Sequence, residues 1–148
     1  MCSDSVMNQE LFIFCLIIRT KPNMYYFIIA LKLTVALSLF NVWLIQKDKP
    51  TKWRGSNAQN IKEEFQIYGL PEWMCYLVGV LKVLGAIGLI ISIWVVSLER
   101  PSALILAFLL TGSIVMHFKI QDPLYKSFPA FLFLVMCLCI AFANLITI

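Results

Sequence analysis

The stretch from residue 73 to residue 96 reads WMCYLVGVLKVLGAIGLIISIWVV, with Lys82 as its one charged side chain. A helix that crosses a bilayer needs about 20 mainly apolar residues, because the hydrocarbon core is about 30 Å thick. The small residues Gly79, Gly85 and Ala86 lie three or four positions from Lys82 and indicate a face where another helix packs closely. We therefore interpret this stretch as a membrane-spanning helix inside a bundle.

Three further apolar runs surround it, at residues 24–45, 101–120 and 128–148. Aromatic residues, which favour the headgroup region, lie toward the ends of these runs: Tyr25, Tyr26, Trp43, Trp73, Tyr76 and Trp94. The sequence predicts an all-α membrane protein, with four transmembrane helices in a bundle that forms a single domain over residues 24–148.

The composition excludes a water-soluble protein. Of the 148 residues, 61% are hydrophobic and 14% are charged, and the mean hydropathy is +0.85. Soluble domains have roughly 45–50% apolar and about 25% charged residues. Soluble enzymes and nucleic-acid binders are therefore excluded, and the expected partner is the lipid bilayer.

Residues 1–23 form a leader before the first span. Its apolar stretch, residues 11–18, is too short to cross a bilayer, and its basic residues follow that stretch instead of preceding it, unlike a signal peptide. We expect an interfacial or disordered leader. Alternatively, translation starts at Met24, which opens the first span directly.

The segment between the first two spans predicts a short amphipathic helix. Ser56 followed by Gln59 forms a capping-box pattern, which predicts a helix start there. Four residues then recur on one helical face: Ala58, Ile61, Phe65 and Tyr68. Gly69 suits a left-handed helix end, and Pro71 suits the first turn of the next helix.

Two other connections have clear turn signals. Residues 99–102 (Glu-Arg-Pro-Ser) predict a tight polar turn between the second and third spans. Asp122 followed by Pro123 predicts a helix cap with proline in the first helical position of the fourth span.

The distribution of basic residues predicts the orientation. Three Lys or Arg residues lie on the side of the termini and seven on the side of the longer loop. By the positive-inside rule, the longer loop faces the cytoplasm and both termini face outward.

Two lysines lie within the spans. Lys82 lies about 13 Å past Trp73 along the helix axis, near the middle of the bilayer, where a charge needs a polar partner. Its small neighbours favour an inward orientation, and the alternative is a side chain that reaches the interface. Lys32 has bulky apolar neighbours, whereas a separate small and polar stripe lies on the opposite side of its helix, so we expect Lys32 to face lipid.

His117 and Glu64 are further candidates for a polar cavity. His117 lies at the end of the third span, where a hydrogen-bonded interfacial role is an alternative to proton transfer. Glu64 borders the apolar face of the loop helix, where it either stays in solvent or folds over the bundle to meet Lys82 or His117. Such a pairing of Glu64 with Lys82 is one hypothesis.

Other chemistries have no support in the residues. His117 is the only histidine, so one chain cannot supply a bis-histidine haem site, and no cysteines or histidines have zinc-ligand spacing. The five cysteines form no Cys-x-x-Cys motif. No phosphate-binding glycine loop or hydrolase motif is present.

With these residues in view, the chain resembles the DoxX-like family of small four-span bacterial membrane proteins. The resemblance covers about residues 24–148 and rests on four stretches: residues 63–73, residues 78–86, residues 116–123 and residues 129–130. In that family, the position that Lys82 matches often holds an ionisable residue, frequently glutamate.

The resemblance implies a protein of the bacterial inner membrane. Family namesakes are membrane subunits associated with quinone-linked oxidation of sulfur compounds, and others resemble helpers of redox or membrane complexes. It therefore implies an accessory subunit, with other membrane subunits as partners and a quinone-sized or lipid-sized cavity near Lys82, Glu64 and His117, for which a quinone is one candidate cofactor. The alternatives are a stand-alone quinone-linked oxidoreductase and a small proton-coupled carrier.

Overall fold

The computed structural model describes residues 9–146, with side chains described for residues 23–143, and within this part the chain is helical with no strands. The elements are α1 (Gln9–Phe40), its π-helical continuation η1 (Asn41–Ile45), α2 (Ile61–Ile67), α3 (Glu72–Ile91), the short 3₁₀ turn η2 (Val96–Leu98), α4 (Glu99–Lys119) and α5 (Leu124–Ile146). Within the described residues, four stretches are long and apolar enough to cross a membrane: Asn23–Ile45, Glu72–Ile91, Val96–Lys119 and Leu124–Ala143. The prediction of four spans with a short helix between the first two is confirmed.

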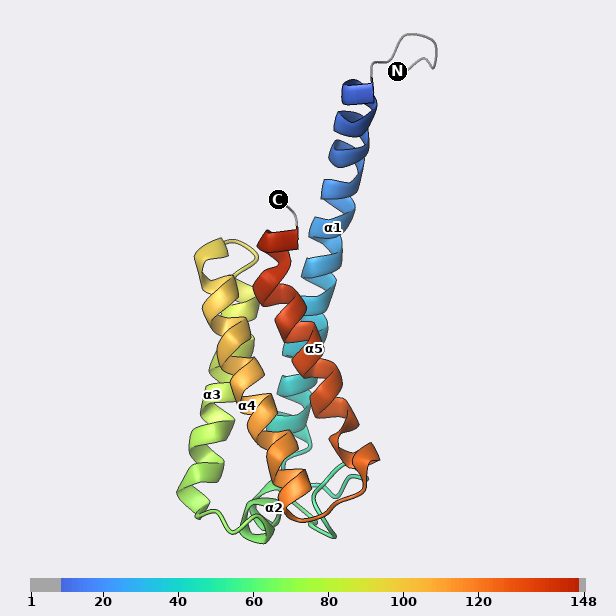
Figure 1. Ribbon diagram of the computed structural model, residues 1–148. Helices are drawn as coiled ribbons and strands as arrows, with labels where there is room; N and C mark the ends of the chain where they lie inside the picture. The colour runs from blue at the N-terminus through green and yellow to red at the C-terminus, as the bar shows by residue number, and fades with distance from the viewer. Residues whose placement is uncertain (1–8, 147–148) are drawn as a thin grey trace.

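The long helices run side by side, and α2 lies across one end of the bundle (Figure 1). The α4–α5 connection lies at this same end, which we call the loop end. The start of α1, the α3–α4 turn and the last turns of α5 lie at the other end, because four spans return the chain to the side where it began. The first turns of α1 extend beyond the other helices.

Each of the four long helices contributes a fully buried side chain to the core: Val35, Leu89, Leu106 and Ile140. The helices α3 and α4 approach closely because Gly85 has no side chain. A Cβ atom at this position would lie 2.7 Å from a methyl group of Leu106. The glycine-rich face that the sequence indicated is therefore the face that packs.

The loop helix begins later than the Ser56 pattern predicted. Its cap is Asn60, whose side chain accepts a 2.9 Å hydrogen bond from the Glu63 backbone nitrogen. The Glu63 carboxylate in turn accepts from the Gln59 nitrogen and from the Asn60 amide. The capping residue is thus four residues downstream of Ser56, which has a positive φ of 50° outside the helix.

The four residues predicted for the apolar face are buried at 8% exposure or less, although Ala58 lies before the helix: Ala58, Ile61, Phe65 and Tyr68. Ile61 and Phe65 of this face form a second core cluster together with Cys75 of α3. Gly69 ends the helix with φ of +78°, a conformation that favours glycine. Pro71 caps α3 and lies one residue before its first turn.

The turn between the second and third spans lies earlier than predicted. Helix α3 ends at Ile91, not near Val96, and the Ser92 hydroxyl donates to the Leu89 carbonyl at 2.6 Å. Residues 99–102 form the first turn of α4 instead of a polar loop. A proline is tolerated there because the first turn of a helix has no internal partners for its N–H groups.

The leader is partly described. Residues 9–23 are helical and continue α1 backward from the first span, and the interfacial or disordered character expected for the leader stays a prediction. Residues 1–8 lie outside the described residues, and the alternative start at Met24 remains a prediction.

Candidate functional site

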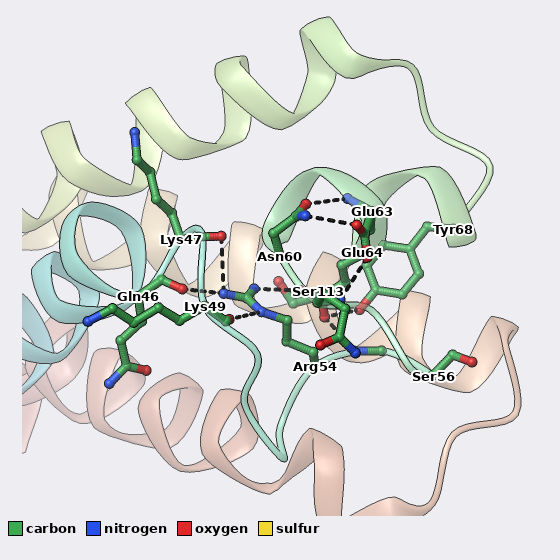
Figure 2. Close-up of polar contacts among 12 residues, drawn as sticks. Gln46, Lys47, Lys49, Arg54, Ser56, Asn60, Glu63, Glu64, Tyr68 and Ser113 are labelled. Carbon is green, nitrogen blue, oxygen red and sulfur yellow. Dashed lines mark hydrogen bonds and ion pairs between the residues drawn. The ribbon is translucent and has the colours of Figure 1, made fainter.

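Arg54 organises the long loop before α2, and sequence reasoning did not single it out. Its side chain is 5% exposed. The guanidinium donates to the backbone carbonyls of Lys49 (2.8 Å), Lys47 (3.3 Å) and Gln46. It also contacts the Glu64 carboxylate at 3.3 Å, so it ties the end of the first span to the loop helix (Figure 2).

Glu64 is folded inward as one alternative predicted, and its side chain is 14% exposed. Its carboxylate accepts from Arg54, from the Gly55 nitrogen at 2.8 Å and from the Tyr68 hydroxyl at 2.7 Å. Burial, followed by the charge and hydrogen bond of Glu64, raises the pKa of Tyr68 above its ordinary value. The phenol therefore stays protonated and remains a hydrogen-bond donor.

His117 at the end of α4 joins this cluster. Its Nε2 atom lies 4.0 Å from the Glu64 carboxylate and 3.5 Å from the Tyr68 hydroxyl. Its Nδ1 atom lies 2.8 Å from the Asp122 carboxylate. An imidazole between two carboxylates, with a phenol beside it, has the groups needed to hold a proton or to pass one between them.

Asp122 links the α4–α5 connection to the long loop instead of capping α5, which contradicts the sequence prediction. Its carboxylate accepts from the Ser56 nitrogen at 3.0 Å and from His117. Lys126 donates to the Ser56 carbonyl at 2.7 Å and lies 3.7 Å from Asp122. The backbone of Ser56 is thus held at both its N–H and its carbonyl.

Neutralising Asp122 is expected to destabilise the protein in a pH-dependent way. Burial by itself raises the pKa of Asp122, but the hydrogen bonds from His117 and Ser56 and the charge of Lys126 outweigh it and lower the pKa below 3.8. A carboxyl with a lowered folded pKa stabilises the fold above its unfolded pKa, and this contribution is lost as the pH falls through the folded value.

The variant Asp122→Asn should therefore unfold more easily than the parent at pH 5, by about 1–3 kcal/mol. The difference should shrink as the pH falls below 3.8. Detergent-based unfolding curves between pH 3 and pH 5 measure it. The exposed Asp48→Asn is the control, and a difference that grows toward low pH contradicts the role assigned to Asp122.

Lys82 is turned into the bundle and is 6% exposed. Its ammonium donates to the Ser113 hydroxyl on α4 at 2.9 Å and lies 5.3 Å from the centre of the Trp43 ring. Gly79 admits this ring, because a Cβ atom there would lie 2.8 Å from it. The hypothesis of a direct Glu64–Lys82 pair is wrong for the described side chains: Glu64 pairs with Arg54 and lies 4.0 Å from His117, whereas Lys82 donates to Ser113.

A cavity of about 360 Å³ lies between these groups at the loop end of the bundle. Lys82, Glu64 and His117 all line it, although they come from three different helices. Further polar side chains also line it, among them Arg54, Tyr68, Ser113 and Lys126. Apolar side chains from all four long helices make up most of its remaining wall. A small, largely apolar cavity with a few polar groups is typical of a ligand site.

Lys32 corrects a sequence prediction, because it faces the bundle and not lipid. It is 4% exposed and forms a 2.6 Å ion pair with Glu99 at the start of α4. Ala30 and Thr34 of the small and polar stripe are exposed instead. Lys32 lies three residues before Val35 and seven before Leu39, so the three share one face of the helix. All three are buried, and the two apolar residues are the sequence signal that favours this face.

The comparisons with known proteins agree with this architecture. The sequence pattern of the DoxX-like family matches residues 54–141, which includes Arg54, the loop helix and most of the last three spans. No curated protein and no solved structure matches the chain. Because the match spans more than half of the chain, this four-span membrane protein belongs to the DoxX-like family.

Proposed function

We propose that this chain is an accessory subunit of a membrane redox complex, or of another membrane complex, and that its cavity binds a quinone-sized, lipid-soluble molecule. The observation that carries the proposal is the cavity itself, where Lys82, Glu64 and His117 meet inside an apolar wall. Its volume of about 360 Å³ falls within the range of small-ligand pockets, about 300–1,000 Å³.

The donors in the cavity suit a quinone head. The Lys82 ammonium carries three N–H groups and donates one to Ser113, so others remain for a carbonyl oxygen. The Tyr68 hydroxyl and His117 lie toward the loop end of the same cavity. A bound quinone supplies two-electron redox chemistry, and the residues of this chain bind and orient it and exchange protons with it.

We also propose that the protein lies in the bacterial cytoplasmic membrane, with its loop end toward the cytoplasm and both termini outside. Four lysines at the loop end are exposed, of which Lys62 is paired with Glu72: Lys47, Lys49, Lys52 and Lys62. Arg54 gives weaker support for the orientation, because its guanidinium is buried and paired with Glu64. Reporter fusions to the long loop and to the C-terminus test this arrangement.

Purification in mild detergent tests the main proposal. We expect a quinone in the solvent extract, at about one per chain, and a membrane partner that stays bound through purification. Lys82→Met should lower the bound quinone at least tenfold, whereas Lys49→Met, which removes the same charge from an exposed site, should leave it unchanged.

The other outcomes discriminate between the candidate functions. A quinone without a partner, together with quinone-linked turnover by the isolated chain, favours a stand-alone oxidoreductase. If neither a quinone nor a partner co-purifies with the parent protein, the proposal is contradicted and the proton-coupled carrier is the better explanation.

A further inference from the structure

The cavity reaches the outer surface of α4. Phe108 and Gly112 both line it, yet Phe108 is 78% exposed and Gly112 is exposed as well. The two residues are four positions apart and therefore share one face of the helix. A Cβ atom at Gly112 would have no neighbouring atom within 4 Å. The cavity wall at Phe108 and Gly112 therefore lies at the exposed surface of α4 with free space beside the glycine, and we call this part of the wall the side opening.

The side opening lies at the depth of the lipid chains. Gly112 is seven residues before the end of α4 at Lys119, which places it about 10 Å inside the span at 1.5 Å per residue. The hydrocarbon core is about 30 Å thick. A molecule that passes this opening therefore comes from the acyl-chain region of the bilayer and not from water.

A cation without a carboxylate partner lies behind the side opening. Ser113 follows Gly112 directly and accepts from Lys82. Within residues 23–143, no carboxylate forms an ion pair with Lys82, whereas Arg54 and Lys126, the other lysine and arginine of the cavity, contact Glu64 and Asp122. A buried charge at this depth is costly unless a polar group meets it. An oxygen acceptor on a bound molecule would be a second polar partner for Lys82 beside Ser113.

We infer that the cavity is filled sideways from the bilayer, through the side opening, by a single-chain amphiphile. Its oxygen-acceptor head binds Lys82 and its chain remains among the lipids. A quinone carbonyl and a fatty-acid carboxylate present the same acceptor chemistry to this lysine. The inference rests on the proposed function for the presence of a ligand in this cavity, and it adds the route and the chemistry of recognition.

Quenching of Trp43 fluorescence tests the route, because this ring lies beside Lys82. The other three tryptophans are replaced by phenylalanine, and the protein is placed in phosphatidylcholine vesicles. The probes are decylubiquinone, whose ring quenches indole emission, and 5-doxyl-stearate, which carries its quencher near the carboxylate. We expect saturable quenching by at least one probe, and at least tenfold weaker binding in Gly112→Phe.

Two control variants separate blockage from misfolding. Gly112→Ala should bind the probe normally, because a methyl group leaves most of the opening free. Val115→Phe adds the same ring one turn further along α4, at an exposed position outside the cavity lining, and should also bind normally. Circular dichroism of each variant verifies that the helices are retained.

The outcomes distinguish this inference from the proposed function. Equal binding by Gly112→Phe and the parent overturns the sideways route but leaves a quinone-binding cavity intact. Saturable quenching by 5-doxyl-stearate alone, with the expected loss in Gly112→Phe, supports the route and contradicts the quinone. Absence of saturable quenching by either probe in the parent overturns the inference, whereas co-purification separately decides the accessory role.

Discussion

Replacing Lys32 with methionine is expected to lower the free energy of unfolding by about 3–5 kcal/mol, because it leaves the buried Glu99 carboxylate without its partner. The two side chains are 4% and 10% exposed and lie 2.6 Å apart. Lys32 also donates to the Ser92 carbonyl at 3.4 Å, so one ammonium joins α1 to both sides of the α3–α4 turn. SDS titration of the protein in mixed micelles measures the change.

The double variant Lys32→Met with Glu99→Met should recover most of this loss, because an apolar pair of similar size needs no compensation. The exposed pair of Lys62 and Glu72, at 3.0 Å, is a matched control and should show a coupling below about 1 kcal/mol. Strictly additive losses in the Lys32 and Glu99 variants show that the pair does not act as a unit.

Arg54→Met is expected to have an effect of similar size, about 3–5 kcal/mol. It removes the donor to three backbone carbonyls and the partner of Glu64. Backbone acceptors left buried without a donor add to the loss. We expect the long loop to open and the loop end to become sensitive to proteolysis, while the helical content from the four spans is largely retained.

Limited proteolysis and SDS titration together measure the Arg54 effect. Arg54→Lys keeps the charge but not the planar set of donors, so it should fall between the parent and the methionine variant. The matched control is Arg100→Met, which removes an exposed guanidinium that lies 5.7 Å from the centre of the Phe142 ring. A stable, protease-resistant Arg54→Met contradicts the role assigned to this residue.

The spans and the buried face of the loop helix were predictable because their signals are local. A run of about 20 apolar residues requires a helix wherever the bilayer removes water from the backbone. The spacing of Ile61, Phe65 and Tyr68 likewise places them on one face, whatever they pack against. Both features are present in the structure.

The start of the loop helix was harder, because the sequence offers two overlapping capping patterns. Ser56 precedes Gln59 by three positions, and Asn60 precedes Glu63 by the same spacing. The choice depends on contacts about 70 residues away: Asp122 and Lys126 hold the backbone of Ser56 outside the helix. Local spacing contains no information about such contacts.

The candidate site was predictable only in its parts. The sequence analysis placed Lys82, Glu64 and His117 near one cavity without their individual partners, and all three line the cavity of the structure. It did not point to Arg54, because an arginine in a polar loop looks like any other surface charge. Its three carbonyl partners exist only after the loop has folded around it.

By itself, the sequence determined that the chain is a four-helix membrane protein with an amphipathic helix across its longer loop, because hydrophobicity and periodicity act over a few turns of one helix. Only the tertiary structure decided that Lys32 lies inside and which partner each of the two buried lysines has. Lys32 turns inward because Glu99, 67 positions later, meets it there, and Lys82 turns to a serine on another helix. The free energy of a buried charge depends on its neighbours in space, and these are set by how the helices pack.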